Sequence, residues 1–410
     1  MSGSGQRGTL FHRPRRAMRR DLSQLVCAVV GLVLGLLAPM LQVGPRVEAG
    51  RVATLLFTAG FGVISLVTLI YSMLFLVVQF SASAFTPRLG LFRDEPIVWR
   101  AFAFTVGVFV FCITAGLSIG TRGNVSAFVP GAAMMLSLVA LGLMRTLQTK
   151  AFSSIQLAHS LTAIADRAHR LFDALYVRPY GPPNAPGRAS AVPPSAAGTS
   201  TVRWSGPAVV VQQIDVAALV GVAEEHDCSL VFRAAPGRAV SRGMALAEVT
   251  GGELSEAVLR RAVVTGVERT FDQDPELPFR LLADIALRAL SPAVNDPATA
   301  VESMDRLEDL LTRLVDRELD IGRFHDAAGR LRVTVPVPGW EQYVATAADD
   351  LVFAAAGSPM ALRRMRDLLG RLLERCPEDR RASVRDRLRW VERTGSESYP
   401  LVWAARVGGA

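Results

Sequence analysis

Residues 53–80, ATLLFTAGFGVISLVTLIYSMLFLVVQF, form a run of 28 residues without a charged side chain. A helix needs roughly 20 apolar residues to cross the hydrocarbon core of a bilayer. Three further uncharged stretches accompany this one: 22–42 (LSQLVCAVVGLVLGLLAPMLQ), 101–119 (AFAFTVGVFVFCITAGLSI) and 127–144 (AFVPGAAMMLSLVALGLM). Four such runs in succession predict four transmembrane helices rather than buried helices of a soluble domain.

Basic residues are distributed unevenly around these spans. They are frequent before the first span, in the second loop and after the fourth span: Arg7, Arg13, Arg15, Arg16, Arg19, Arg20, Arg88, Arg93, Arg100, Arg145 and Lys150. Cytoplasmic loops carry an excess of Lys and Arg. We therefore expect a multi-pass protein of the bacterial inner (cell) membrane with both termini in the cytoplasm. The favoured partner of the basic start is the anionic inner leaflet of the lipid bilayer, and no nucleic acid is expected.

The composition excludes several kinds of chemistry. The 410 residues include 45 Lys and Arg against 37 Asp and Glu, and Lys150 is the only lysine. No glycine-rich loop precedes Lys150, so phosphate-loop, Schiff-base and swinging-lysine chemistry are set aside. The four cysteines and five histidines show no paired metal-ligand spacing, so we expect no metal and no cofactor. No catalytic arrangement of Ser, His and Asp or of Cys and His can be assembled, and the chain is not expected to be an enzyme.

The chain divides into six segments by composition and periodicity. These are a basic cytoplasmic N-terminus (1–21), a four-helix transmembrane domain (22–147), a cytosolic helical extension (148–177), a linker rich in Pro, Gly, Ser and Ala (178–202), a small β-rich module (203–250) and a mainly helical cytosolic domain (251–410). The predicted fold class is an α-helical membrane protein with a cytosolic α+β region. Within the first span, Gly31 and Gly35 form a GxxxG pattern, which predicts a close helix–helix contact within one chain or between chains.

Residues 268–300 are rich in polar side chains, including Gln273 and Asp274, which precede the stretch FRLLADIALRALSPAVNDPATA. This run, with FTPRLGLFRDE at 85–95, IDVAAL at 214–219 and four spans ahead of it, resembles the DUF2254 family of bacterial membrane proteins. The resemblance covers nearly the whole chain and is most specific over residues 284–300. It implies the architecture given above and supplies no activity.

Arg280, Asp284 and Arg288 lie four residues apart on one face of a predicted helix, 277–290. Such a ladder forms i,i+4 ion pairs on a solvated face; alternatively it is a site for a small anionic ligand or a partner's carboxylate, or a contact between subunits. Ser291 ends the helix before Pro292, and Asp296 followed by Pro297 has the pattern of an N-cap, with Asn295 beside it. The candidate ligand- or partner-binding residues are therefore Arg269, Asp274, Arg280, Asp284, Arg288, Ser291, Asn295 and Asp296.

These observations favour a membrane-anchored oligomeric sensor or scaffold whose cytosolic region binds a ligand or a protein partner. The alternative is an oligomeric ion channel gated by that region, and a membrane enzyme ranks third. Spans without charges argue against a proton-coupled transporter, which usually needs ionisable residues inside the membrane. They are compatible with a channel, which can use hydroxyls and carbonyls.

The arginine distribution predicts the topology of both termini. Single cysteines introduced at Gly5 or Gly409, in a variant without the native cysteines, should react with an impermeant maleimide only after the membrane is permeabilised. Labelling of either position in intact spheroplasts would overturn this topology.

Overall fold

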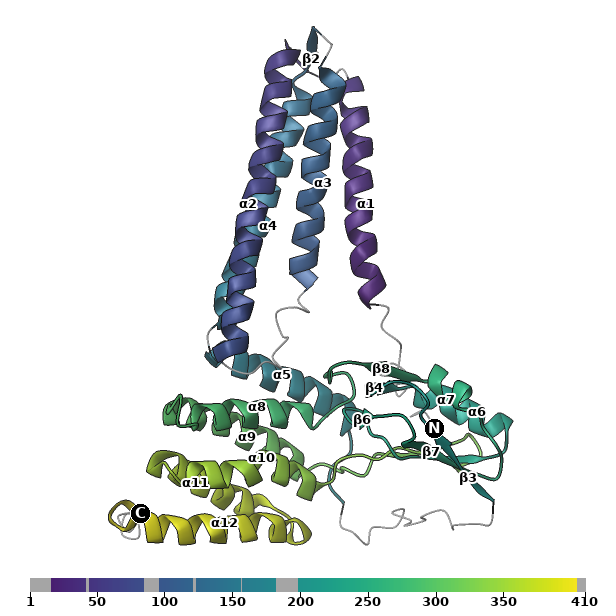
Figure 1. Cartoon of the computed structure of the whole chain (residues 1–410), viewed down its shortest axis with the longest axis vertical. Coiled ribbons are helices and arrows are strands. Elements are labelled where there is room, and N and C mark those ends of the chain that lie inside the picture. Colours follow the sequence, from purple (N-terminus) through teal and green to yellow (C-terminus); the bar gives the residue numbers. More distant parts are fainter. Residues whose placement is uncertain are drawn as a thin grey trace. The chain divides into compact units, whose positions relative to one another are not determined.

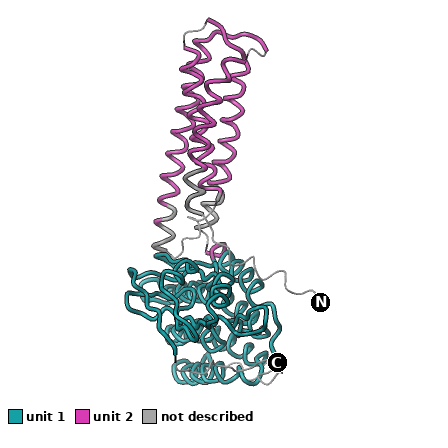
Figure 2. The backbone as a smooth tube through the Cα atoms, turned by 90° about the vertical axis from the view of Figure 1, so that its right-hand side faces the viewer, with its two compact units in different colours: residues 1–13, 161–410 teal, residues 14–160 magenta. Residues whose placement is uncertain are grey.

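The computed structural model describes residues 16–41, 44–84, 96–120, 123–155, 157–181 and 198–403. The basic residues before position 16, the second loop at 85–95 and most of the expected 178–202 linker lie outside the described residues. The chain divides into two compact units, which Figure 2 distinguishes by colour. One unit comprises residues 14–160, and the other comprises residues 161–410 with residues 1–13.

The unit of residues 14–160 is built from long apolar helices joined at one end by a short pair of strands (Figure 1). Its elements are α1 (Arg16–Leu37), η1 (Ala38–Met40), β1 (Arg46–Glu48), α2 (Ala49–Ala84), α3 (Pro96–Ile119), β2 (Asn124–Ser126) and α4 (Phe128–Ile155). Within the described residues, four helices are long and apolar enough to cross a membrane: Ser23–Met40, Ala49–Leu76, Ile97–Ile119 and Phe128–Thr149. The four predicted spans therefore correspond to four candidate transmembrane helices.

Helix α3 is the central helix of this unit. Half of its span (50%) is buried, against 22% of each of the other three spans, because α1, α2 and α4 all pack on it. Gly31 and Gly35 of α1 both face α3 of the same chain. A Cβ on Gly31 would lie 2.2 Å from the carbonyl oxygen of Gly107, and one on Gly35 would lie 2.7 Å from Oγ1 of Thr114. Small residues allow helix backbones to approach this closely in lipid.

The unit of residues 161–410 combines two β-sheets with a stack of helices. Its first part comprises α5 (Leu157–Leu175), β3 (Thr199–Arg203), β4 (Val209–Ile214), α6 (Val216–Glu225), β5 (Ser229–Phe232), β6 (Ala239–Val240), β7 (Ala245–Thr250), α7 (Glu256–Arg261) and β8 (Val263–Gly266). The second part comprises α8 (Leu277–Ala289), α9 (Pro297–Val315), β9 (Arg323–His325), β10 (Leu331–Thr334), α10 (Trp340–Ala355), α11 (Pro359–Arg375), α12 (Glu378–Ser398) and α13 (Pro400–Trp403).

The β-rich region is assembled from distant parts of the chain. Among the described residues, five strands form a sheet in the order β3-β7-β5-β10-β9, and three form an antiparallel sheet in the order β6-β4-β8. Strand β10 pairs parallel with β5, whereas the other neighbours in the five-stranded sheet are antiparallel. Apolar side chains from both sheets, among them Trp204, Ile214 and Phe232, share one core. Strands β8, β9 and β10 thus extend the β-rich region beyond the 203–250 stretch that the sequence indicates.

The helices after β8 form two layers. Helix α8 packs on α10 and α10 on α12 in one layer, while α9 packs on α11 in the other (Figure 1). Asp296 accepts hydrogen bonds from the Thr299 backbone N–H (3.2 Å) and Oγ1 (2.6 Å), which confirms its predicted role as the N-cap of α9. Buried leucines at i, i+3 and i+4, such as Leu307, Leu310, Leu311 and Leu314, direct one face of α9 into the core.

The close approach of α1 and α3 predicts a position-specific cost for a single methyl group. Gly31→Ala should destabilise the unit by about 1–3 kcal/mol, because the new Cβ overpacks against the Gly107 carbonyl. Gly62→Ala on α2 is the matched control, since a Cβ there meets nothing within 4 Å. Melting of both full-length variants in detergent, followed by size-exclusion chromatography, measures the difference. Equal melting temperatures for the two variants would show that α1 and α3 are not in this contact.

Candidate functional site

The side chain of Asp274 is the most deeply buried charged group among the sequence-predicted site residues. Its residue is only 1% exposed, and Arg269 binds it with two hydrogen bonds, from Nε to Oδ2 (2.6 Å) and from Nη2 to Oδ1 (2.8 Å). The backbone N–H groups of Glu276 (3.2 Å) and Leu277 (3.1 Å) also donate to Oδ1, at the start of α8. Burial raises the pKa of Asp274, and the Arg269 guanidinium opposes that rise. Arg269 is therefore the side chain that most favours the ionised form of this buried carboxyl group.

The loop that carries this ion pair is fixed to the β-sheets. The Gln273 side chain accepts a hydrogen bond from the Ile214 backbone N–H (2.9 Å) and donates one to the Ile214 carbonyl (3.2 Å). Gly237, in the turn before β6, has a φ of +85°, and a Cβ there would lie 2.1 Å from Oδ2 of Asp274. A side chain at this turn would displace the carboxylate, so both the backbone conformation and the space require glycine.

Further charges extend the pair into a network that we call the junction network: Arg238, Arg269, Asp274, Glu276, Arg280, Asp284 and Asp350. Glu276 lies 3.7 Å from Arg238 and 3.6 Å from Arg269, and it accepts a hydrogen bond from Thr346 of α10 (2.8 Å). Arg280 pairs with Asp284 (2.9 Å) and with Asp350 of α10 (3.2 Å). Carboxylates of Asp274, Glu276 and Asp284 raise the pKa of Arg269 although burial, the largest single influence, lowers it. The network therefore joins the turn before β6, α8 and α10.

The charge balance of this network differs from the expectation drawn from the sequence. The ladder of Arg280, Asp284 and Arg288 predicts a local excess of positive charge, suited to an anionic group or to a partner's carboxylate. In the structure Arg280 contacts two carboxylates, and the acid from α10, Asp350, comes from 70 residues further along the chain. Arg280 is therefore compensated locally, and its surroundings offer alternating charges rather than an open anion site.

The turn between α8 and α9 lies at the other end of α8. Ser291 Oγ donates to the Arg288 carbonyl (2.7 Å), and Asn295 adopts a φ of +50°, in the left-handed region. Asp296 caps α9 through Thr299. The 13 residues of α8 separate this turn from Asp274 by about 20 Å at 1.5 Å per residue. The structure thus brings Arg269, Asp274, Arg280 and Asp284 together and leaves Ser291, Asn295 and Asp296 in a separate, structural turn.

An aromatic cluster lies beside the junction network, and the sequence does not predict it. The hydroxyls of Tyr176, just after α5, and Tyr343 of α10 are 2.5 Å apart, and burial raises the pKa of both. Phe279 stacks on Phe172 of α5 at 5.9 Å and tilts against Tyr343 at 5.2 Å. Only five tyrosines occur in the chain, and no local pattern indicates that these two pair across 167 residues.

The described residues contain no group of three or more His, Cys, Asp or Glu side chains that could hold a metal ion. The arrangement of the junction network is that of a charged, hydrogen-bonded contact between elements. It can bind a surface with complementary charges, and it offers no nucleophile paired with a base.

Comparison with known proteins identifies relatives of this chain. Residues 22–371 match the model of a family described as "Predicted membrane protein (DUF2254)". An uncharacterised protein of Mycobacterium bovis and one of Mycobacterium tuberculosis are each 26% identical to it over 355 residues. These matches cover 82% of this chain and 66% of each relative, so the chain spans a little under two thirds of the length of these proteins. No solved structure shows a significant match.

The burial of Asp274 predicts unequal effects for two arginine substitutions. Arg269→Ala removes the partner of a buried carboxylate and should lower the free energy of unfolding by about 3 kcal/mol. Arg280→Ala, whose side chain is 35% exposed, should lower it by no more than about 1 kcal/mol. Chemical denaturation of the full-length protein in detergent, followed by tryptophan fluorescence, compares the two. Similar small losses for both would show that Asp274 does not depend on Arg269.

Proposed function

This chain belongs to the DUF2254 family of predicted membrane proteins, and we propose that it is a membrane-anchored oligomeric sensor or scaffold. In this proposal the four apolar helices span the bacterial inner membrane, and both termini and the unit of residues 161–410 lie in the cytoplasm. The soluble unit binds a protein partner, of which a second copy of the chain is the simplest, and the membrane helices anchor it.

The observation that supports this function is the position of α5. It begins at Leu157, two residues after α4 ends at Ile155, and from Leu161 onward it belongs to the soluble unit. Its buried face includes Leu161, Ile164 and Phe172, and its polar face is held by ion pairs to α9. Arg313 contacts Asp173 at 2.7 Å and His169 contacts Asp309 at 2.7 Å. Helix α5 is therefore integral to the unit of residues 161–410, and only one residue separates it in the sequence from the end of α4.

The same helix leads to the junction network. Phe172 of α5 stacks on Phe279 of α8, and Arg280 is the next residue of α8. The side chains of Arg280 and Asp350 are 35% and 61% exposed, so solvent reaches both members of this pair. A protein surface that also carries paired charges can exchange partners with them, whereas a single small anion would have to displace two carboxylates. A protein partner is therefore the ligand class that this surface supports best.

Reconstitution of the full-length protein tests the proposal. In nanodiscs, Arg280→Ala and Asp350→Ala should each raise the dissociation constant of the oligomer at least tenfold, as measured by mass photometry, while the melting temperature stays within a few degrees. Arg389→Ala is the matched control, because this exposed arginine pairs with Asp386 on α12, away from α8.

Two outcomes would contradict the proposal. Unchanged assembly in both variants would exclude the Arg280–Asp350 surface as the oligomer contact. Ion flux in proteoliposomes, at rates that Arg280→Ala leaves unaltered, would instead support the channel.

A further inference from the structure

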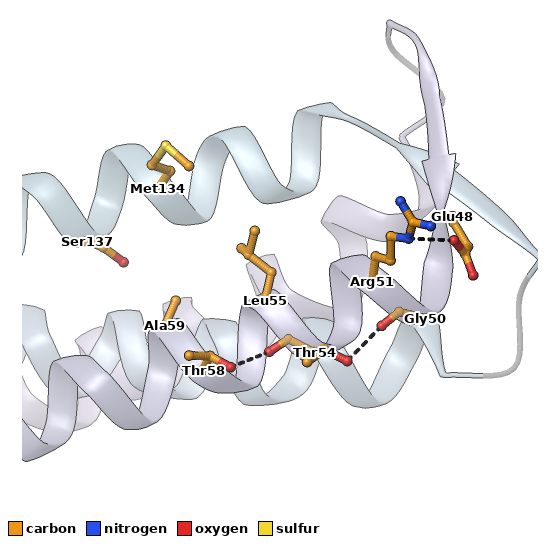
Figure 3. Close-up of a pocket in the computed structure, with 9 residues that line it drawn as sticks. All are labelled: Glu48, Gly50, Arg51, Thr54, Leu55, Thr58, Ala59, Met134 and Ser137. Atoms are coloured by element: carbon orange, nitrogen blue, oxygen red, sulfur yellow. Dashed lines mark hydrogen bonds and ion pairs between the residues drawn. The ribbon is translucent and has the colours of Figure 1, made fainter.

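A groove of about 690 Å³ lies between α2 and α4, near the end where β1 pairs with β2. Figure 3 shows the side chains that line it: Glu48, Gly50, Arg51, Thr54, Leu55, Thr58, Ala59, Met134 and Ser137. Its volume falls within the range of small-molecule binding sites. Because both helices are candidate membrane spans, an occupant would have to enter from the bilayer or from its surface.

The lining of the groove changes from charged to apolar along α2. Arg51 and Glu48 form an ion pair at its mouth, from Nε to Oε2 at 2.8 Å, with side chains 84% and 63% exposed. Thr54 follows one turn further along and Thr58 another turn, about 10 Å from Arg51 at 1.5 Å per residue. Leu55 lies between them on the same lining. The charged groups therefore lie at the end of the groove next to β1, as the charged headgroup lies at one end of a glycerophospholipid, and uncharged side chains follow along α2.

The hydroxyl groups of the groove lining differ in their hydrogen bonding. Among the described residues, Ser137 Oγ is inaccessible to solvent and has no hydrogen-bond partner. Thr54 and Thr58 instead donate to backbone carbonyls of their own helix, at 3.0 and 2.8 Å. A hydroxyl removed from water without a partner is costly, and the cost is greatest in hydrocarbon.

We propose that this groove binds one molecule of a zwitterionic aminophospholipid, with its phosphate on Arg51, its ammonium on Glu48 and an acyl chain along Leu55, Ala59 and Met134. The adjacent opposite charges at the mouth match a headgroup that itself carries both signs. A purely anionic headgroup would meet Glu48 as a like charge. This inference rests on the proposed membrane insertion of α2 and α4.

Lipid binding to the purified full-length protein tests the roles of Arg51 and Glu48. Native mass spectrometry with added phosphatidylethanolamine should show one saturable lipid, and Arg51→Gln should weaken its binding at least tenfold. Glu48→Gln should weaken the binding of phosphatidylethanolamine and leave the binding of phosphatidylglycerol unchanged or stronger. Arg46→Gln, on β1 at the same end but outside the groove lining, is the control and should change neither. Equal phosphatidylethanolamine binding by wild type and Arg51→Gln would overturn the proposal.

Substitutions without charge test the groove itself. Ala59→Leu should exclude the lipid by filling the groove. The control Leu76→Phe, on a 65% exposed side chain of α2 outside the lining, should leave binding intact. If Ala59→Leu alters the oligomer while no lipid binds to the wild type, a second copy occupies the groove and the lipid proposal is wrong.

The failure of this proposal differs from the failure of the proposed function. Release of the wild-type protein from membranes by alkaline carbonate would overturn both. Retention in the membrane without a saturable phosphatidylethanolamine would overturn the lipid site alone.

Discussion

The carboxylate of Asp274 lies where the β-sheets and the stacked helices of the unit of residues 161–410 meet. It accepts hydrogen bonds from the Arg269 side chain and from two backbone N–H groups at the start of α8, and it rests against the glycine turn before β6. An ionised group taken out of water must have its lost hydration replaced in full. The position of α8 relative to the sheets is therefore coupled to the geometry of these donors. Because α10 packs on α8 and contributes Thr346 and Asp350 to the same network, the helical layers depend on this junction as well.

Different interactions stabilise the interior of each unit. In the unit of residues 161–410, apolar side chains are withdrawn from water and buried charges are paired. In the unit of residues 14–160, whose helices are candidate membrane spans, small residues allow close packing between helices. The glycines of α1 against α3 provide that packing, and α3 is the most buried span as a result. A substitution can therefore destabilise the unit of residues 14–160 by overpacking its helices. In the unit of residues 161–410 it can do so by leaving a buried charge without its partner.

The sequence predicts only part of the charge pairing around Arg280. The i,i+4 spacing of Arg280 and Asp284 predicts their pairing, which the structure contains at 2.9 Å. The contribution of Asp350 from α10 could not be predicted, since it depends on how α8 and α10 pack. This one neighbour gives Arg280 a second carboxylate partner. Similarly, Glu48 and Arg51 are only three residues apart, whereas the groove beside them depends on the packing of α2 against α4.

Local features of this protein follow from the sequence by itself. Runs without charge define the four candidate spans, and Asp296 marks the start of α9, because hydropathy and N-capping act within a few residues. The tertiary structure alone decided that β10 returns after α9 to pair parallel with β5, that Tyr176 meets Tyr343, and that Gly237 makes room for Asp274. Each of these contacts joins residues from 37 to 167 positions apart, so it arises from the packing of whole elements and leaves no periodic signal in either segment.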